Sequence, residues 1–343
     1  MRDYYGEVLQ SNQDLKTSAC CPTDSLPNYQ KTLLAKMHPT VLERFYGCGS
    51  PIAPALQDQV VLDLGCGTGR DSFLMAALGA KKVIGIDMTD SQLEVARSSL
   101  GFHLDVYKLA PQSLDFIRGE IEDLKALGIQ DHSIDVVTSN CVINLSDDKE
   151  KVFKEIFRVL KPGGELIFSD VFSSRRLSAS AKKDPTLVGE CLGGAMYIED
   201  FRRLMAKCGV DDYRTLSTSP ISLKNAQFED LDLISKIAGV EFFSKTIRAF
   251  KMPLEDRCED FGQVAIYRGG IEHHEFSFLL DDHHLFEKNR PMLVCGNTAD
   301  MLGRSRYGRF FEISGNKEQH FGIFDCVPAV VQSNSQNLAA GCC

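Results

Sequence analysis

The sequence predicts an α/β fold, in which a parallel sheet with crossover helices carries an N-terminal arm and a small C-terminal α+β domain. From Val60 to Cys208, apolar runs of strand length alternate with segments of helical periodicity, as parallel pairing through crossovers requires. The first of these runs is broken by closely spaced glycines and continues into a helical segment. After about residue 211, two runs of alternating apolar and polar residues are instead typical of antiparallel strands.

We expect four parts along the 343 residues, which are enough for one large domain and a smaller one. Their ranges are 1–50 for an N-terminal arm and helix that carry cysteines, 51–210 for a cofactor-binding domain, 211–300 for the C-terminal α+β domain and 301–343 for a polar, loosely held tail.

The N-terminal part combines a polar arm with helical segments. Short helices are predicted near 4–10 and over 33–46, the second restarted by Pro39 at a first helical position. The glycines on either side of Cys48 then place that cysteine on a turn.

The central domain should contain five strands and four helices. We expect the strands at 60–64, 82–88, 116–124, 133–145 and 163–172, and the helices at 71–78, 89–100, 147–160 and 199–208. Thr89 and Gln92 have the spacing of a capping box at the start of the second helix.

Beyond this domain, a helix is predicted near 228–237. The alternating runs 241–252 and 262–270 suit an antiparallel pair, which either closes the sheet edge or belongs to the appended domain.

Composition argues against several classes of protein. The formal net charge is −9 and no basic stripe is present, so nucleic acid is not an expected partner. No apolar run is long enough to span a membrane, and the N-terminus is too polar for a signal peptide, so a cytoplasmic location is expected. The twelve cysteines should then be mostly thiols, which favours metal binding, redox work or catalysis over a disulfide framework.

The glycine-broken strand end predicts a cofactor site. Gly65, Gly67 and Gly69 allow a tight turn and a close approach by a ligand, but Arg70 stands where a dinucleotide fingerprint needs a small residue. The spacing resembles the first motif of S-adenosylmethionine-dependent methyltransferases. About twenty residues further on, Asp87 ends the next strand, where an acid can accept the ribose hydroxyls.

Several cysteines should converge beside that site. Cys141 lies at the end of the fourth strand, immediately after Asn140, Cys191 lies in a glycine-rich loop after the fifth strand, and Cys48 lies on its turn. The strand-end segments contain no histidine to act as a base, which favours a soft nucleophile with its own lone pair. The remaining cysteines of the folded region are interpreted as small core residues, and a metal role for the His273-His274 and His283-His284 pairs as the less favoured interpretation. The core cysteines are Cys66, Cys208, Cys258, Cys295 and Cys326.

Several sequence blocks together resemble the arsenite methyltransferase family, in the family's order, over roughly residues 4–271. The blocks are DLKTSACC, RFYGCGSP, DLGCGTGRD, GIDM, SNCVINL, GECLGGAMY and QVAIYRGGI. The resemblance implies a Rossmann-like class I methyltransferase sheet and thiolate ligands to trivalent arsenic from Cys48, Cys141 and Cys191, with Cys20 as the fourth redox cysteine. The cofactor contacts that it implies are Tyr46, Asp63, Gly65, Cys66, Gly67, Arg70, Asp87, Met88, Ile121, Glu122 and Asn140.

The family's chemistry implies a methyl group passed from S-adenosylmethionine to thiolate-bound arsenic, giving methylated arsenicals. Trivalent arsenicals would be the substrates, and glutathione or thioredoxin the external reductant between rounds. We expect a monomer. Two alternatives remain at this stage: a carbon methyltransferase of quinone or sterol type, and a thiol-based metalloid-binding protein without catalytic activity.

Overall fold

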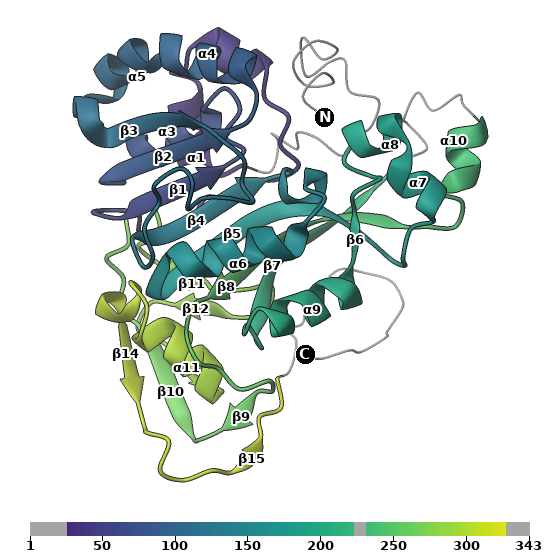
Figure 1. The fold of residues 1–343 in the computed structure, drawn as a ribbon. Coiled ribbons are helices and arrows are strands. Elements are labelled where there is room, and N and C mark those ends of the chain that lie inside the picture. Colours follow the sequence, from purple (N-terminus) through teal and green to yellow (C-terminus); the bar gives the residue numbers. More distant parts are fainter. Residues whose placement is uncertain (1–25, 223–230, 327–343) are drawn as a thin grey trace.

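A central mixed sheet organises the computed structural model, which describes residues 26–222 and 231–326. Its strand order is β3-β2-β1-β4-β5-β8-β7, with β6 paired to β5 (Figure 1). The first five strands are parallel, whereas β8 runs antiparallel to both β5 and β7. The predicted α/β fold with a Rossmann-like sheet is therefore confirmed.

The elements of the sheet and its helices occupy residues 28–250. The strands are β1 (Val60–Leu64), β2 (Lys82–Asp87), β3 (Leu114–Arg118), β4 (Ile134–Asn140), β5 (Leu160–Ser173), β6 (Met196–Tyr197), β7 (Tyr213–Ile221) and β8 (Phe242–Phe250). The helices are α1 (Asn28–Leu34), α2 (Pro39–Glu43), α3 (Arg70–Ala77), α4 (Asp90–Ser98), α5 (Leu100–Tyr107), α6 (Lys149–Val159), α7 (Ala179–Lys183), α8 (Pro185–Gly189), α9 (Ile198–Lys207) and α10 (Leu231–Lys236).

Alternate strand residues point to opposite faces of the sheet, so each face packs against its own helices. On one face, Leu62 and Phe168 lie in the same apolar cluster as Phe153 of α6 and Phe201 of α9. On the other face, Val61 and Ile167 pack with Phe73 of α3 and Leu93 of α4. Both faces are therefore covered, and the carboxyl ends of the strands remain as the place for a site.

The C-terminal unit follows β8 and contains short strands around one helix. Figure 1 shows it at the end of the molecule opposite α4 and α5. Its elements are β9 (Glu259–Asp260), β10 (Gln263–Tyr267), β11 (Ser277–Leu279), β12 (Leu285–Glu287), β13 (Pro291–Val294), α11 (Gly296–Gly303), β14 (Phe311–Ser314) and β15 (Gly322–Ile323).

A buried ion cluster joins this unit to the central sheet. Glu165 of β5 is fully buried, 2.5 Å from Arg248 Nε of β8 and 2.6 Å from Arg306 Nη2 of the C-terminal unit. The hydroxyl of Tyr307 also donates to Glu165, over 2.8 Å. Burial raises the pKa of Glu165, but the two guanidinium groups outweigh it and the pKa is lowered overall. The carboxylate therefore stays charged where the two units meet.

The predicted pairing of the two alternating runs is wrong. The first run forms β8, which pairs with β5 and β7 in the central sheet. The second forms β10, which pairs with β13 and β14. Because two strands follow the expected boundary at residue 210, the central sheet extends to Phe250, and only later residues form the separate unit.

The strand and tail predictions also need correction. The third and fourth strands end at Arg118 and Asn140, since turns and a 3-10 helix follow instead of the predicted extended residues. The expected loose tail is folded as far as residue 326, where β14 and β15 pair with β10 and β9. The predicted helix at 4–10 and the last part of the tail fall outside the described residues. No helix among the described residues is long and apolar enough to cross a membrane.

Candidate active site

A pocket opens at the carboxyl ends of β1, β2 and β4, where the sequence predicts the cofactor. Ten of the eleven expected cofactor residues line it, together with Cys141. The complete lining is Arg44, Phe45, Tyr46, Gly47, Asp63, Gly65, Cys66, Gly67, Thr68, Asp71, Asp87, Met88, Thr89, Gln92, Gly119, Glu120, Ile121, Glu122, Asn140, Cys141, Val142, Leu145 and Ser146.

The glycine turn after β1 brings the backbone close to the pocket. Gly65 has a φ of +70°, a left-handed conformation that side chains disfavour, and a Cβ there would lie 2.3 Å from Val142 Cγ2. The Gly67 N–H donates a hydrogen bond to Asp87 Oδ2 over 2.9 Å, which ties this turn to the end of β2. Glycine is thus required by both conformation and space.

Asp87 provides a carboxylate beside the turn. Its Oδ1 accepts the Thr89 N–H at 2.8 Å, and burial raises its pKa. The Thr89 hydroxyl also bonds to Asp87, so Thr89 makes no side-chain cap for α4. The predicted capping box is therefore wrong, because Thr89 faces Asp87 and Gln92 lines the pocket.

Asn140, at the end of β4, connects the cofactor pocket to the Cys48 turn. Its Oδ1 accepts the backbone N–H groups of Cys48 and Gly49, at 3.1 and 3.3 Å. Its Nδ2 donates to the Gly49 carbonyl at 3.0 Å and to Asp71 Oδ2 at 2.8 Å. One amide therefore fixes the position of a cysteine that lies 92 residues earlier in the chain.

Arg70 is the one expected cofactor residue that does not line the pocket. Its guanidinium lies 3.7 Å from the centre of the Phe45 ring, and its Nη1 lies 3.2 Å from Asp71 Oδ1. The expected direct contact is therefore replaced by an indirect role, since Arg70 holds two residues that do line the pocket.

Three cysteines meet next to the pocket. Cys48 and Cys141 form a disulfide with a Cα–Cα distance of 5.8 Å, and the thiol of Cys191 donates to the Cys141 carbonyl over 3.7 Å. All three are at most 3% exposed and share an apolar cluster with residues such as Leu187 and Phe242. The predicted convergence of these three cysteines is therefore observed, with two of them oxidised. Cys20 lies outside the described residues.

Two of these cysteines have an unusual backbone. Cys141 and Cys191 each have a φ of +60°, in the left-handed region that residues with a Cβ rarely adopt. Such conformations cost of order 1 kcal/mol each and are found preferentially at functional sites. The fold therefore holds both sulfur-bearing residues in strained positions.

A carboxyl group lies beside the disulfide. An oxygen of Asp170 and the sulfur atoms of Cys48 and Cys141 all lie within 4.8 Å of one another. Burial raises the pKa of Asp170 to about 7, although the backbone N–H groups of Val171 and Asn144 donate to it. Sequence reasoning missed this group because the strand that carries it was interpreted only as part of the buried core of the sheet.

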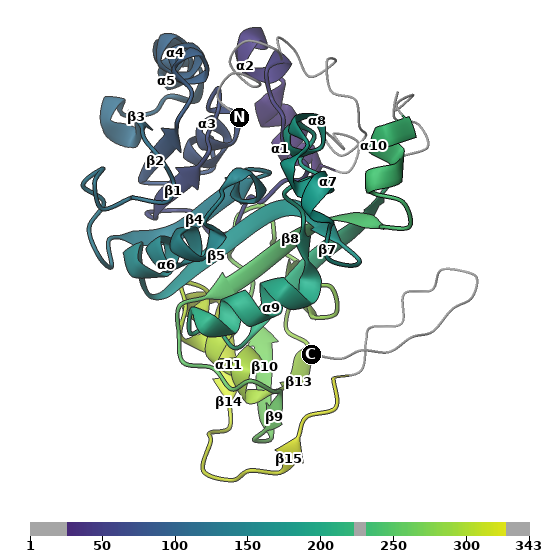
Figure 2. The ribbon, with the colours of Figure 1, turned by 45° about the vertical axis from the view of Figure 1, so that its right-hand side comes forward.

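Short helices cover the cysteines. The helices α7, α8 and α10 lie side by side in the two views (Figures 1 and 2), and Leu187, Ala181 and Leu233 pack in the cysteine cluster. Asp184 caps α8 by accepting the N–H groups of Thr186 and Leu187, and its other oxygen lies 3.0 Å from Lys236 Nζ. These contacts fix the helices α7, α8 and α10 against the cysteine cluster that contains Cys191.

Other lining residues had no separate signal in the sequence. Thr68 and Asp71 lie within the glycine motif, so their neighbours indicated them indirectly, whereas Gln92 was concealed by its helical spacing. Ser146 donates to Glu122 Oε1 over 2.5 Å, a contact between two separate loops that only the tertiary structure reveals.

Comparison with known proteins gives matches along nearly the whole chain. A family described as "Methyltransferase domain" matches residues 56–209, and one described as "Arsenite methyltransferase C-terminal domain" matches residues 261–341. An arsenite methyltransferase of Aquipseudomonas alcaligenes is 47% identical over 95% of this chain and 93% of its own length. The human arsenite methyltransferase is 38% identical, covering 91% of this chain and 82% of its own.

A solved structure also resembles the chain. An arsenic (III) S-adenosylmethionine methyltransferase from Chlamydomonas reinhardtii aligns with a TM-score of 0.82 and 45% identity. The alignment covers 88% of this chain and the whole of that structure.

Proposed function

Since the chain belongs to the arsenite methyltransferase family, we propose that it transfers methyl groups from S-adenosylmethionine to trivalent arsenic held by Cys48, Cys141 and Cys191. One observation carries the proposal: Cys141 both lines the cofactor pocket and belongs to the cysteine cluster. Arsenic bound to its sulfur is therefore adjacent to a methyl donor in the pocket.

The pocket residues fit the cofactor. S-adenosylmethionine supplies an electrophilic methyl group on a sulfonium. The bare backbone at Gly65 permits a close approach, and the Asp87 carboxylate offers acceptors for ribose hydroxyls. Met88, Ile121 and Leu145 would provide apolar contacts to the cofactor. Tyr46 and Asn140 belong to the same lining, on the side nearest the Cys48 turn.

Three thiolates suit trivalent arsenic because soft sulfur ligands select thiophilic centres. In the reduced protein, Cys48 and Cys141 would join Cys191 as ligands, displacing water or a carrier thiol from arsenic. S-adenosylmethionine bound in the pocket would supply the methyl carbon, to which the arsenic lone pair would bond while the electron pair of the donor's carbon–sulfur bond stays on sulfur. Because the sulfur positions are fixed, the rate enhancement of methyl transfer comes mainly from the orientation of the reacting atoms.

The transfer formally oxidises arsenic by two electrons, so a two-electron reduction must follow. Two thiols that form a disulfide supply those electrons, and the Cys48–Cys141 disulfide has the composition of the resulting oxidised state. An external thiol, glutathione or thioredoxin, would return the pair to thiols. We propose Cys20 as the further participant in this exchange.

Asp170 is placed to take part in proton exchange at the same sulfur atoms. With a pKa raised to about 7, its carboxyl can accept a proton from a thiol near neutral pH. Arsenic itself needs no deprotonation, since its lone pair is already available for attack.

The test is turnover with arsenite, S-adenosylmethionine and a thiol reductant, followed by separation of the arsenic species. We expect methylated arsenicals in a cofactor- and reductant-dependent yield. A protein that binds arsenite stoichiometrically but forms no methylated product would be a metalloid carrier. Methylation that persists after substitution of Cys141 and Cys191 by serine would contradict the thiolate site.

A further inference from the structure

The segment that follows Cys48 runs from the cysteine cluster to the C-terminal unit. Residues 48–56 form neither helix nor strand, so their buried carbonyl groups need side chains as hydrogen-bond donors. At the first end, the Ser244 hydroxyl of β8 donates to the Cys48 carbonyl over 2.7 Å. Further along, the Thr138 hydroxyl of β4 donates to the Pro51 carbonyl over 2.8 Å. The central sheet therefore holds the first part of the segment.

The C-terminal unit holds the second part of the segment. Arg306, which follows α11, donates from Nε to the Ala55 carbonyl over 3.2 Å and from Nη2 to the Pro54 carbonyl over 3.0 Å. Ala55 is 4% exposed and belongs to the apolar cluster of that unit, together with residues such as Tyr267 and Leu302. Its φ of +56° lies in the left-handed region, so the surrounding contacts must maintain this conformation.

The guanidinium of Arg306 is itself anchored on the central sheet. Its Nη2 lies 2.6 Å from Glu165 Oε2 of β5 and donates to the Tyr307 hydroxyl over 2.6 Å, and its side chain is only 9% exposed. A guanidinium presents its N–H donors in one rigid plane. Because a buried carboxylate fixes that plane, the same group can hold two backbone carbonyls in fixed positions.

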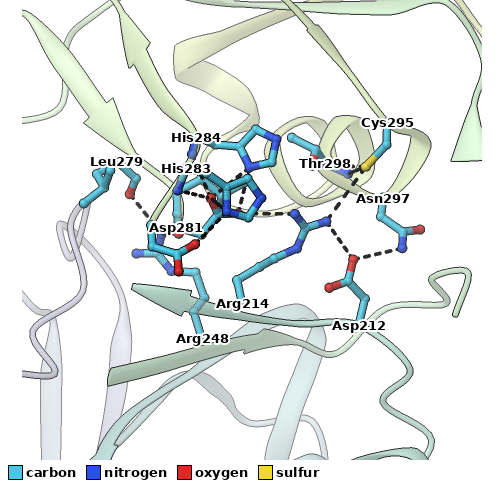
Figure 3. A network of polar contacts seen from close by, with 12 residues as sticks. Asp212, Arg214, Arg248, Leu279, Asp281, His283, His284, Cys295, Asn297 and Thr298 are labelled. Carbon is cyan, nitrogen blue, oxygen red and sulfur yellow. Dashed lines mark hydrogen bonds and ion pairs between the residues drawn. The ribbon is translucent and has the colours of Figure 1, made fainter. Parts of the chain in front are cut away.

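Other charged contacts hold the C-terminal unit on the sheet as well. Arg248 of β8 donates from Nη1 to the Leu279 and Leu280 carbonyls, at 3.1 and 2.6 Å. On the next strand, Nη1 of Arg214 lies 3.2 Å from Asp281 Oδ2 (Figure 3). These side chains are buried, and breaking such a pair would leave an uncompensated charge. The unit is therefore a firm support for the residue that holds the segment.

We propose that the C-terminal unit positions Cys48 for arsenic binding, with Arg306 as the positioning residue. This role rests on the proposed function, because it concerns contacts that lie outside the site and act on one of its ligands. Asn140 and Ser244 hold the Cys48 end of the segment, and Arg306 holds the far end, so the segment cannot slide along the sheet. The Cys48 sulfur is thereby kept within reach of Cys141.

These contacts matter most in the reduced protein. While the disulfide is formed, Cys48 is tied to Cys141 through its sulfur. After reduction, only the noncovalent contacts of the segment keep Cys48 beside Cys141 and Cys191. A segment loosened at Ala55 leaves the Cys48 sulfur with more accessible positions, so the three sulfur atoms are less often arranged to bind one arsenic.

The test is the equilibrium of the Cys48–Cys141 pair with glutathione, measured in the full-length protein by alkylation and mass analysis of the peptides. Each protein disulfide that forms converts one glutathione disulfide into two thiols, so the equilibrium constant reports how well Cys48 is placed. Arg306→Lys keeps a positive charge beside Glu165 but loses the planar donors to the two carbonyls. We expect this constant to fall by about tenfold, which makes the reduction potential about 30 mV less negative.

Arg214→Lys is the matched control. Arg214 is a buried arginine between the same two units, but its hydrogen bonds go to Asp212, Asp281 and Cys295 instead of to residues 48–56. This variant should keep the wild-type equilibrium constant. In the methylation assay, Arg306→Lys should lower kcat/KM for arsenite by about tenfold. Its Kd for S-adenosylmethionine, measured by calorimetry, should stay at the wild-type value.

Arg306→Gln covers the case in which the lysine variant fails to fold. It leaves Glu165 paired with Arg248 alone, so the buried cluster keeps one charge of each sign, and we expect the same fall in the constant. A wild-type constant in a folded Arg306 variant, or an equal fall in Arg214→Lys, would overturn the positioning role. A shifted constant in a protein whose wild type forms no methylated arsenic would support the positioning of Cys48 and count against the proposed function.

Discussion

The active-site cysteines and Cys295 of the C-terminal unit are the same residue type in opposite surroundings. Around Cys48, Cys141 and Cys191 the neighbours are mainly apolar side chains, and two of these cysteines have left-handed backbones. Around Cys295, by contrast, lie the guanidinium of Arg214 and the N-terminus of α11. The active-site cysteines adjoin the cofactor pocket, whereas Cys295 lies among the short strands of the C-terminal unit.

This difference shows that the residues around a thiol determine its chemical role. A strained and apolar group that already forms a disulfide is suited to exchange between oxidation states and to a neutral substrate. A thiol held by a guanidinium and a helix N-terminus has fixed polar partners, which suit a structural role. Each prediction below separates these roles or tests what positions the active group.

The largest effect is expected from Cys191→Ser. Serine keeps the size of the side chain but removes a soft ligand, so methylation of arsenite should fall by about 100-fold or more. The assay is initial rate under saturating S-adenosylmethionine. Cys208→Ser should retain the wild-type rate. An equal loss in both variants would mean that general thiol removal, and not the site, causes the effect.

Asn140→Ala should have the next largest effect, because this amide holds the Cys48 turn through two accepted and one donated hydrogen bond. We expect kcat/KM for arsenite to fall by about 10- to 100-fold, as misplacement of a reacting group by about 1 Å would cause. Steady-state kinetics with each substrate varied in turn measure this. Wild-type kinetics in this variant would show that the turn is held by other contacts.

Asp87→Asn should lower the affinity for S-adenosylmethionine and leave the affinity for arsenite unchanged. Loss of a charge-assisted hydrogen bond of about 1.5 kcal/mol corresponds to a Kd for S-adenosylmethionine that is about 10-fold higher. Calorimetric titration of the cofactor provides the measurement. The affinity for arsenite in the same variant should be unchanged, and a parallel loss of both affinities would contradict the separation of the two subsites.

The smallest effect is expected in the pH dependence of the free energy of unfolding. The pKa of Asp170 is raised to about 7, so the folded protein binds its proton more tightly than the unfolded chain does. The resulting stabilisation is complete below the unfolded pKa, near 4, and is lost as the pH rises towards 7. From pH 6 to pH 8 this one group should lower the free energy of unfolding by about 1 kcal/mol.

Asp63, whose pKa is also raised to about 7 by burial, should add a similar loss. Urea unfolding of wild type and Asp170→Asn at both pH values is the measurement. The variant should retain only about half of the pH dependence. If the free energy of unfolding depends on pH in the same way in the variant, groups other than Asp170 cause that dependence.

Much of the site followed from local sequence, for physical reasons. Gly65 and Asp87 lie at the ends of adjacent parallel strands, so a strand pattern alone brings them together. The left-handed Gly65 could be expected because a tight turn was required. Cys141 and Cys191 follow neighbouring strands in the same way, which is why their convergence was predictable.

What failed depended on contacts between distant segments. The partner of β8 is decided by which edge of the sheet is open, which residue alternation does not encode. Arg70 turned towards Phe45 instead of the pocket because an aromatic ring from an earlier segment lies beside it.

The central claim is that three sulfur atoms bind arsenic beside the methyl donor. X-ray absorption at the arsenic edge tests it most directly, on the fully reduced protein with less than one equivalent of arsenite. The account predicts three sulfur neighbours per arsenic in the wild type, and two sulfur neighbours with one oxygen in Cys191→Ser. Oxygen neighbours in the wild type, or an identical spectrum in the variant, would contradict it.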